Sequence, residues 1–313
     1  MNFDKNNLDQ ARSPYLKQHA ENPIHWQEWS KEVLDHAKRE GKLILVSVGY
    51  STCHWCHVMA KEAFSDVAIA EKLNKDFVAI KVDREERPDL DHYFMDFALK
   101  TIGGGGWPLN VVLSPEGHPF FAGTYFPVVA EHGLPSFGEL LDQVKGWHEQ
   151  NRDDLKEYKM TVVAAEKAEE KDLIEGIFKA FDSENGGFGN GTKFPPHTTL
   201  LFLLSYFEET RDERAQKILE KTLDAMALGG LHDHLQGGFY RYTVDSKWQI
   251  PHFEKMLYDQ AMHLWVYSLA VRLLKKDLYK EVVAQLIRSL KETFEIDGLF
   301  AAGHDADTEH EEG

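Results

Sequence analysis

The only two cysteines of this 313-residue chain lie two residues apart, in the run Cys53-His54-Trp55-Cys56. Two thiols at this spacing can exchange a disulfide with another molecule. The thiolate of one cysteine attacks, and the second thiol then attacks the mixed disulfide and releases the partner. The spacing therefore predicts a dithiol–disulfide redox site at Cys53 and Cys56.

The flanking sequence predicts how these thiols are positioned. Residues 43–48 form a short apolar run, typical of a buried strand, and residues 58–64 have helical spacing. A helix that begins at Cys53, after a four-residue loop, places that sulfur at unpaired backbone N–H groups and at the positive end of the helix dipole. Such a site lowers a thiol pKa from ~8.5 by one or more units. We therefore expect Cys53 to be the attacking thiolate and Cys56 to resolve the mixed disulfide.

Three other interpretations of these residues remain open. With His57, the run also matches the Cys-x-x-Cys-His attachment site of c-type haem. Haem attachment requires export, whereas residues 1–18 lack the apolar segment typical of a signal peptide. Structural zinc usually takes four ligands from two separated pairs, and the sequence has no second cysteine pair. The third interpretation is two buried thiols without chemistry. We expect no metal and no cofactor.

Composition narrows the expected partners and location. The chain has 35 Lys and Arg residues against 52 Asp and Glu residues, for a formal net charge of −17. This charge disfavours binding to nucleic acid and to anionic membranes. No apolar run approaches the ~20 residues of a membrane span. Two cysteines do not make a disulfide framework, which is typical of a reducing compartment, so we expect a cytoplasmic protein.

The first half of the sequence predicts one α/β domain behind an aromatic leader. In residues 1–41, here called the leader, we expect a helix over 27–39 and packing of Tyr15, Trp26 and Trp29 on the following domain. A lid beside the dithiol is the alternative role for these aromatic residues. The expected strands cover residues 43–48, 76–83, 109–114 and 119–125, with helices between the first three. The predicted result is an α/β sandwich around one mixed sheet.

This order of elements resembles the thioredoxin fold over about residues 42–126. The resemblance implies that Pro108 is a cis-proline opposite the dithiol and that Trp107 lines a groove for an extended substrate. It also implies that Asp83 is a candidate proton acceptor near Cys56, although a helix cap or a surface charge is an equal alternative.

The two residues between the cysteines differ from thioredoxin, which has Gly-Pro there. In this chain they are His54 and Trp55, which we expect to border the substrate groove. An imidazole at this position favours the thiolate and raises the reduction potential. The sequence leaves the direction of electron flow open.

Longer motifs identify a more specific family. The motifs are Ser-Pro-Tyr-Leu-Lys-Gln-His (13–19), Gly-Tyr-Ser-Thr-Cys-His-Trp-Cys-His (49–57), Lys-Val-Asp-Arg-Glu-Glu-Arg-Pro-Asp (81–89) and Gly-Gly-Trp-Pro-Leu-Asn (105–110). Together they resemble the thioredoxin-domain family that includes spermatogenesis-associated protein 20 and its bacterial and archaeal relatives. The resemblance implies protein dithiols or disulfides as substrates.

The second half of the sequence predicts helices. We expect a thioredoxin-like domain over 42–148, a helical linker over 149–171 and a mostly α-helical domain over 172–313. Paired helices joined by loops rich in glycine and aromatic residues indicate an α/α toroid. The same family's C-terminal region resembles the six-hairpin barrels of sugar epimerases and glycosidases. Because the family's chains are longer, we expect an incomplete toroid here.

A carbohydrate-active or sugar-binding site is the alternative function, with a non-redox thioredoxin-like module. Its candidate residues are Arg241, His252, Glu254 and Asp259, with His232 and His234 as outliers. Paired carboxylates can act as acid and base, and a histidine can move a proton at neutral pH. We favour a simpler role, in which these groups connect long loops by hydrogen bonds. A metal site at His232, Asp233 and His234 is the weakest interpretation.

Overall fold

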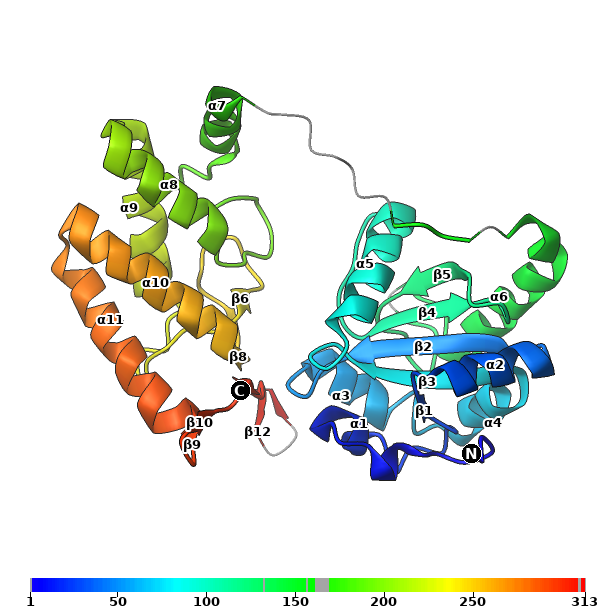
Figure 1. Cartoon of the computed structure of the whole chain (residues 1–313). Helices are drawn as coiled ribbons and strands as arrows, with labels where there is room; N and C mark the ends of the chain where they lie inside the picture. The colour runs from blue at the N-terminus through cyan, green and yellow to red at the C-terminus, as the bar shows by residue number, and fades with distance from the viewer. Residues whose placement is uncertain (1, 132, 156, 161–168, 309–310, 313) are drawn as a thin grey trace. The chain divides into compact units, whose positions relative to one another are not determined.

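The chain folds into two compact units, Met1–Val163 and Ala164–Gly313, each with its own core. The structure is a computed structural model that describes residues 2–131, 133–155, 157–160, 169–308 and 311–312 (Figure 1). The first unit is an α/β domain of the thioredoxin-like class, and the second is mostly helical.

A five-stranded mixed sheet, in the order β1-β3-β2-β4-β5, forms the centre of the first unit (Figure 1). Its strands are β1 (Gln27–Glu28), β2 (Leu43–Gly49), β3 (Phe77–Asp83), β4 (Leu109–Leu113) and β5 (Pro119–Gly123). β3 runs parallel to β1 and β2, whereas β4 runs antiparallel to both β2 and β5. β2, β3 and β4 are buried along their whole length, which explains their nearly continuous apolar sequences.

The expected helix over residues 27–39 begins later than the periodicity predicts. Gln27 and Glu28 instead form β1, and helix α2 (Lys31–Glu40) follows it. The reason is local, because the Ser30 hydroxyl accepts the N–H of Val33 and so caps the helix at this point. Gly41 then ends α2 with a positive φ of 64°.

Helices cover both faces of the sheet. They are α1 (Pro14–Gln18), α2, α3 (His54–Lys61), α4 (Val67–Asp76), α5 (Pro88–Ile102) and α6 (Phe137–Asn151), with a 3-10 turn before α1 (Leu8–Gln10) and another after α6 (Arg152–Asp154). Side chains at 44, 46 and 48 of β2 share a core with α2 and α5. Because strand residues alternate between the two faces, residues 45, 47 and 49 lie on the opposite face. Residues 79, 81 and 83 of β3 lie on that face too, and α1 and α4 contact β3 there.

The leader packs tightly on this second face. Tyr15 and Trp26 are fully buried, and together with Phe64 they surround a buried lysine, Lys81. The Lys81 Nζ atom lies 4.5 Å from the ring centre of Phe64 and 5.2 Å from those of Tyr15 and Trp26. It donates a hydrogen bond of 2.9 Å to Ser47 Oγ. Burial lowers the pKa of Lys81 well below its usual value, because the ammonium loses its hydration.

The linker differs from its expected helical form. Helix α6 ends at Asn151, and residues 157–160 are not helical; residues 161–168 lie outside the described part of the chain. Tyr158 gives the physical reason, since in this conformation its hydroxyl donates to Asp96 at 2.6 Å and its carbonyl accepts from Tyr93 at 3.1 Å. A short charged helix without a packed face has no comparable stabilisation.

The second unit is built mainly from helices. They are α7 (Glu170–Ala180), α8 (His197–Thr210), α9 (Glu213–Leu228), α10 (Leu257–Leu274) and α11 (Asp277–Ser289), followed by a π turn (Leu290–Phe294). Two-residue connections join α8 to α9 and α10 to α11. In each, a cationic residue, Arg211 or Lys275, ends the first helix with a positive φ. Apolar side chains from α8 to α11, with Trp248, form one core, as expected for helical hairpins.

Short strand pairs connect the helices of the second unit. The pairs are β6 (Tyr242–Thr243) with β7 (Pro251–His252), β8 (Lys255–Met256) with β11 (Gly303–His304), β9 (Glu295–Ile296) with β10 (Leu299–Phe300), and β12 (Asp307–Thr308) with β13 (Glu311–Glu312). The β6–β7 pair fixes the conformation of the loop that carries the candidate residues Arg241, His252 and Glu254.

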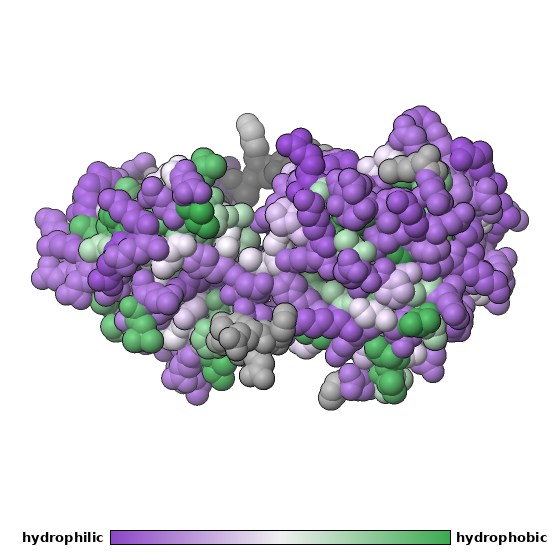
Figure 2. All heavy atoms as spheres, turned by 90° about the horizontal axis from the view of Figure 1, so that it is seen from below, coloured by the Kyte–Doolittle hydropathy of each residue, from purple (hydrophilic) through white to green (hydrophobic). Residues whose placement is uncertain are grey.

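The surface agrees with the charged composition. In the view of Figure 2, hydrophobic residues form small groups separated by hydrophilic ones. Within the described residues, no helix has both the length and the apolar character that crossing a membrane requires.

The buried lysine makes a testable contribution to stability. Its pKa is lower in the folded state, so the unfolded chain binds the extra proton, and stability rises with pH up to the unfolded pKa near ~10.4. Lys81→Met should abolish this gain, which amounts to at most about 1.4 kcal/mol per pH unit. Denaturant unfolding of both proteins between neutral and alkaline pH measures the difference.

Lys38→Met, a change at an exposed site on α2, is the matched control and should follow the wild-type pH profile. Parallel profiles for the wild type and Lys81→Met would show that Lys81 keeps its proton in the fold.

Candidate functional site

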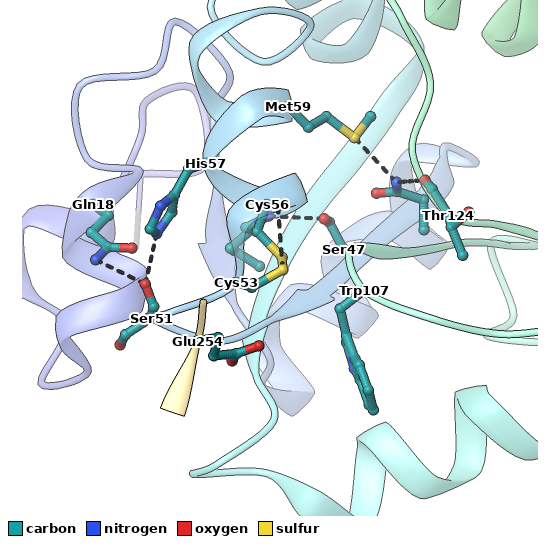
Figure 3. Close-up of a disulfide and its surroundings, with 12 residues drawn as sticks. Gln18, Ser47, Ser51, Cys53, Cys56, His57, Met59, Trp107, Thr124 and Glu254 are labelled. Atoms are coloured by element: carbon teal, nitrogen blue, oxygen red, sulfur yellow. Dashed lines mark hydrogen bonds between the residues drawn. A yellow bond between two sulfur atoms is a disulfide. The ribbon is translucent and has the colours of Figure 1, made fainter. Parts of the chain in front are cut away.

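The two cysteines form a disulfide at the start of α3 (Figure 3). Cys53 caps the helix, and its sulfur accepts the N–H of Cys56 at 3.2 Å. This N–H group and the helix dipole would stabilise a thiolate on Cys53 after reduction. Cys53 retains 3% of its surface, whereas Cys56 is fully buried, so Cys53 is the sulfur that a substrate can reach more readily.

Hydrogen bonds to two backbone carbonyls hold the loop before the cysteines. The Ser51 carbonyl lies 2.6 Å from His57 Nε2 and 3.5 Å from the side-chain nitrogen of Gln18, as Figure 3 shows. The Tyr50 carbonyl accepts the N–H of Cys53 at 3.2 Å. His57, which lies on α3, thus holds the loop that precedes this helix.

Trp107 and Pro108 lie at the head of β4, and the peptide bond between them is cis. The indole N–H of Trp107 donates to Asp91 at 2.7 Å, and the Arg84 guanidinium lies 4.0 Å from its ring centre. The ring also meets Tyr50 edge-on at 5.7 Å, which connects it to the cysteine loop. Trp107 is therefore held in one orientation beside the site.

The residues between the cysteines form an aromatic surface. Trp55 is 48% exposed, and its ring centre lies 5.1 Å from that of Tyr125 and 5.4 Å from that of His54. The Tyr125 hydroxyl donates to Glu62 at 2.7 Å. Burial, followed by this carboxylate, raises the pKa of Tyr125. An exposed indole beside a reactive sulfur offers apolar contact area to an incoming chain.

Asp83 anchors the leader. Its carboxylate accepts hydrogen bonds from the Ser13 hydroxyl at 2.5 Å and from the Glu85 N–H at 2.9 Å. The same Ser13 oxygen caps α1 by accepting the N–H of Leu16 at 3.1 Å. These contacts join the end of β3 to the start of α1 and give Asp83 a structural role, while a proton-accepting role at Cys56 stays a prediction.

Sequence reasoning missed three residues close to the dithiol. Ser47 points toward Cys56 in Figure 3, and Lys81 lies behind Ser47 on the next strand. Gly49 has no room for a side chain, because an added Cβ would overlap the Tyr15 hydroxyl and lie 2.7 Å from Cys56 Sγ. The sequence did contain a signal for two of them. Ser47 and Lys81 are polar residues inside otherwise apolar strands, and they pair in register on the same face of the sheet.

In the second unit, three of the four candidate sugar-site residues meet. Glu254 is fully buried, and its carboxylate lies 3.2 Å from Arg241 Nη1 and 3.7 Å from His252 Nε2. Asp259 lies in the first turn of α10, where its backbone carbonyl is 2.8 Å from His263 Nδ1.

Other polar residues of these loops are engaged in the same way. Lys255 pairs with Asp233 at 2.6 Å. Burial alone raises the pKa of Asp233, but the hydrogen bond from Lys255 and two backbone N–H groups hold it below its usual value. His232 Nδ1 and His234 Nε2 each lie 3.0 Å from a backbone carbonyl oxygen. The metal interpretation requires Asp233, His232 and His234 as ligands. In the structure, Asp233 and one ring nitrogen of each histidine are instead engaged in these protein contacts.

Comparison with known proteins identifies the family. The family model Thioredox_DsbH, described as a protein of unknown function, DUF255, matches residues 5–167. The chain belongs to this family. Human spermatogenesis-associated protein 20 is 40% identical over 332 residues, which cover 98% of this chain and 42% of the relative. The chain thus spans less than half the length of the curated relatives it matches.

Two solved structures each resemble part of this Thioredox_DsbH family member. A DsbH oxidoreductase covers 39% of this chain and 83% of its own, at 19% identity and a TM-score of 0.30. A sugar epimerase from a ruminal bacterium covers 42% of this chain and 37% of its own, at 16% identity and a TM-score of 0.39. Both TM-scores are low, so the fold described above rests on the chain's own elements.

The Arg241–Glu254 pair should be important for stability. Glu254→Gln removes the carboxylate from a buried ion pair, which typically costs about 3–5 kcal/mol. Denaturant unfolding followed by circular dichroism measures the loss. Glu281→Gln, at an exposed site on α11, should change stability by less than about 0.5 kcal/mol. A similarly small effect of Glu254→Gln would contradict the structural role of the pair.

Proposed function

We propose that the first unit is a thiol–disulfide oxidoreductase that acts on protein substrates. The main support is the arrangement of the two sulfurs: Cys53 accepts a backbone N–H at the start of a helix, and Cys56 is buried behind it. This asymmetry gives the two thiols different roles, which dithiol exchange requires.

In the reducing direction, the Cys53 thiolate attacks one sulfur of a substrate disulfide and displaces the other as a thiolate. Cys56 loses its proton and attacks the Cys53 sulfur, which breaks the mixed disulfide and releases the second substrate thiolate. The substrate gains two electrons, and the enzyme is left with the Cys53–Cys56 disulfide. The same steps in reverse oxidise a substrate dithiol.

The surroundings favour an extended polypeptide as the substrate. Trp55 and Tyr125 offer an aromatic surface on one side of Cys53, and Trp107 is held in place through Asp91 and Arg84. We assign Trp55, His54, Trp107 and Pro108 to the substrate groove. The low cysteine content supports a cytosolic location, in agreement with a dithiol that is kept partly reduced.

We propose no sugar chemistry for the second unit. Glu254 is fully buried and paired with Arg241, whereas a general acid or base must reach a substrate. Its contacts support the stabilising role assigned to it above.

A redox titration read by thiol alkylation and mass tests the proposal. We expect one two-electron couple with a potential of roughly −180 to −320 mV, the range of cytosolic and exchange-active dithiols. Absence of a couple, or thiols that become reactive only after metal chelation, would rule out this function.

Trapping tests the assigned order of the two thiols. Cys56→Ser should accumulate mixed disulfides with protein substrates, because the resolving thiol is missing, and Cys53→Ser should accumulate far fewer. Mass spectrometry of non-reduced complexes measures both variants. Equal trapping by the two variants would contradict the roles given to Cys53 and Cys56.

A further inference from the structure

The hydroxyl group of Tyr15 lies next to the sulfur of Cys56. Tyr15 belongs to α1 in the leader and is fully buried. A Cβ atom added to Gly49 would have Tyr15 Oη and Cys56 Sγ as its two nearest neighbours, in overlap with the first and 2.7 Å from the second. The hydroxyl and the sulfur therefore lie on the same side of Gly49, and they can approach each other only because this residue has no side chain.

The Tyr15 hydroxyl has no hydrogen-bond partner in the disulfide form, as judged from the described residues. Buried hydroxyl groups are nearly always paired, because an unpaired one loses its hydration without compensation. The nearby Lys81 Nζ atom is already bonded to Ser47 Oγ. Tyr15 Oη is thus a buried hydroxyl without a partner, close to a redox-active sulfur.

The leader holds this hydroxyl rigidly and keeps it protonated. Ser13 caps α1 and is bonded to Asp83, which fixes the helix that carries Tyr15. The ring of His19 packs edge-on against that of Tyr15 at 5.0 Å. Burial, followed by the negative charge of Asp83, raises the pKa of Tyr15 well above its usual value. At neutral pH the group is therefore a neutral phenol that can donate its proton to an acceptor.

We propose that Tyr15 donates a hydrogen bond to the Cys56 sulfur in the reduced dithiol, and so acts as a positioning residue that stabilises the reduced state. This inference deepens the proposed function and rests on it. The Cys56 sulfur is a poor acceptor while it is bonded to Cys53. When a dithiol reductant transfers two electrons, the S–S bond breaks, the reductant becomes a disulfide, and Cys56 becomes a thiol or thiolate. A thiolate is a strong acceptor for a buried phenol.

This hydrogen bond would make the Cys53–Cys56 disulfide a stronger oxidant. Any interaction present only in the reduced form raises the reduction potential, and a tenfold change in the equilibrium constant corresponds to about 30 mV for two electrons. Tyr15→Phe removes the hydroxyl and keeps the ring that packs on Lys81. We expect its potential to be more negative by about 30 mV, a tenfold shift toward the disulfide.

The ionisation of Cys56 gives a second, independent measurement. In a Cys53→Ser background the lone Cys56 thiol can be titrated by the pH dependence of its alkylation rate. Adding Tyr15→Phe should raise its pKa by about one unit, a tenfold loss of thiolate, because the thiolate loses a donor. Lys81 and Asp83 on β3 and His19 on α1 face Tyr15 and are present in both proteins, so their effects cancel in the comparison.

Two controls separate this role from simple packing. Tyr93→Phe removes a hydroxyl of the same unit, one that donates to the Tyr158 carbonyl, and should leave both the potential and the Cys56 pKa unchanged. The midpoint temperature of thermal unfolding of Tyr15→Phe should be lower than that of the wild type when both proteins are reduced. It should not be lower when both are oxidised, because the hydroxyl then has no partner.

A folded Tyr15→Phe protein with wild-type potential and wild-type Cys56 pKa would overturn the inference. Failure of the proposed function looks different, since the wild type would then lack exchange with protein disulfides. The Cys56 pKa would still decide the role of Tyr15 in that case, because its measurement requires no substrate.

Discussion

The two-residue alternation of β2 and β3 is the constraint on which the dithiol site depends. It places residues 47, 49, 81 and 83 on one face of the sheet, the face that α1 and α4 contact. Each position has its own role there. Ser47 binds Lys81, Gly49 leaves room for a sulfur and a hydroxyl, and Asp83 fixes the leader. A one-residue shift of either strand would move its two residues to the face that α2 and α5 cover.

The sequence was sufficient to predict the elements that carry strong local signals. The strand patterns over 43–48 and 76–83 and the spacing of Cys53 and Cys56 led to the strands, the helix start and the dithiol. Local signals failed where distant contacts decide the structure. β1 pairs with β3 across more than fifty residues, and the linker leaves its expected helix so that Tyr158 can reach α5. The surroundings of Lys81 come from three separate segments, which no sequence window contains.

The second unit uses buried charge in a different way from the first. There the loops carry lysine and arginine side chains that are paired with carboxylates, as in Arg241–Glu254, Lys255–Asp233 and Lys193–Asp182. The residue types in these loops suggested a catalytic site in the sequence. Only the fold shows which side chain pairs with which. The same amino acids can catalyse or connect loops, and the difference lies in whether a side chain faces a substrate or another side chain.

Strand β1 also has a consequence for the integrity of the sheet. Without Gln27 and Glu28, β3 would be an edge strand, and its backbone N–H and C=O groups would be open to pairing with another chain. β3 is buried throughout and apolar over Phe77–Ile80, which makes such an edge prone to aggregation. The Gln27 side chain donates to the carbonyls of Lys5 and His25, so other residues of the leader hold the covering strand in place. The leader therefore protects the domain against edge-to-edge association as well as contributing to its core.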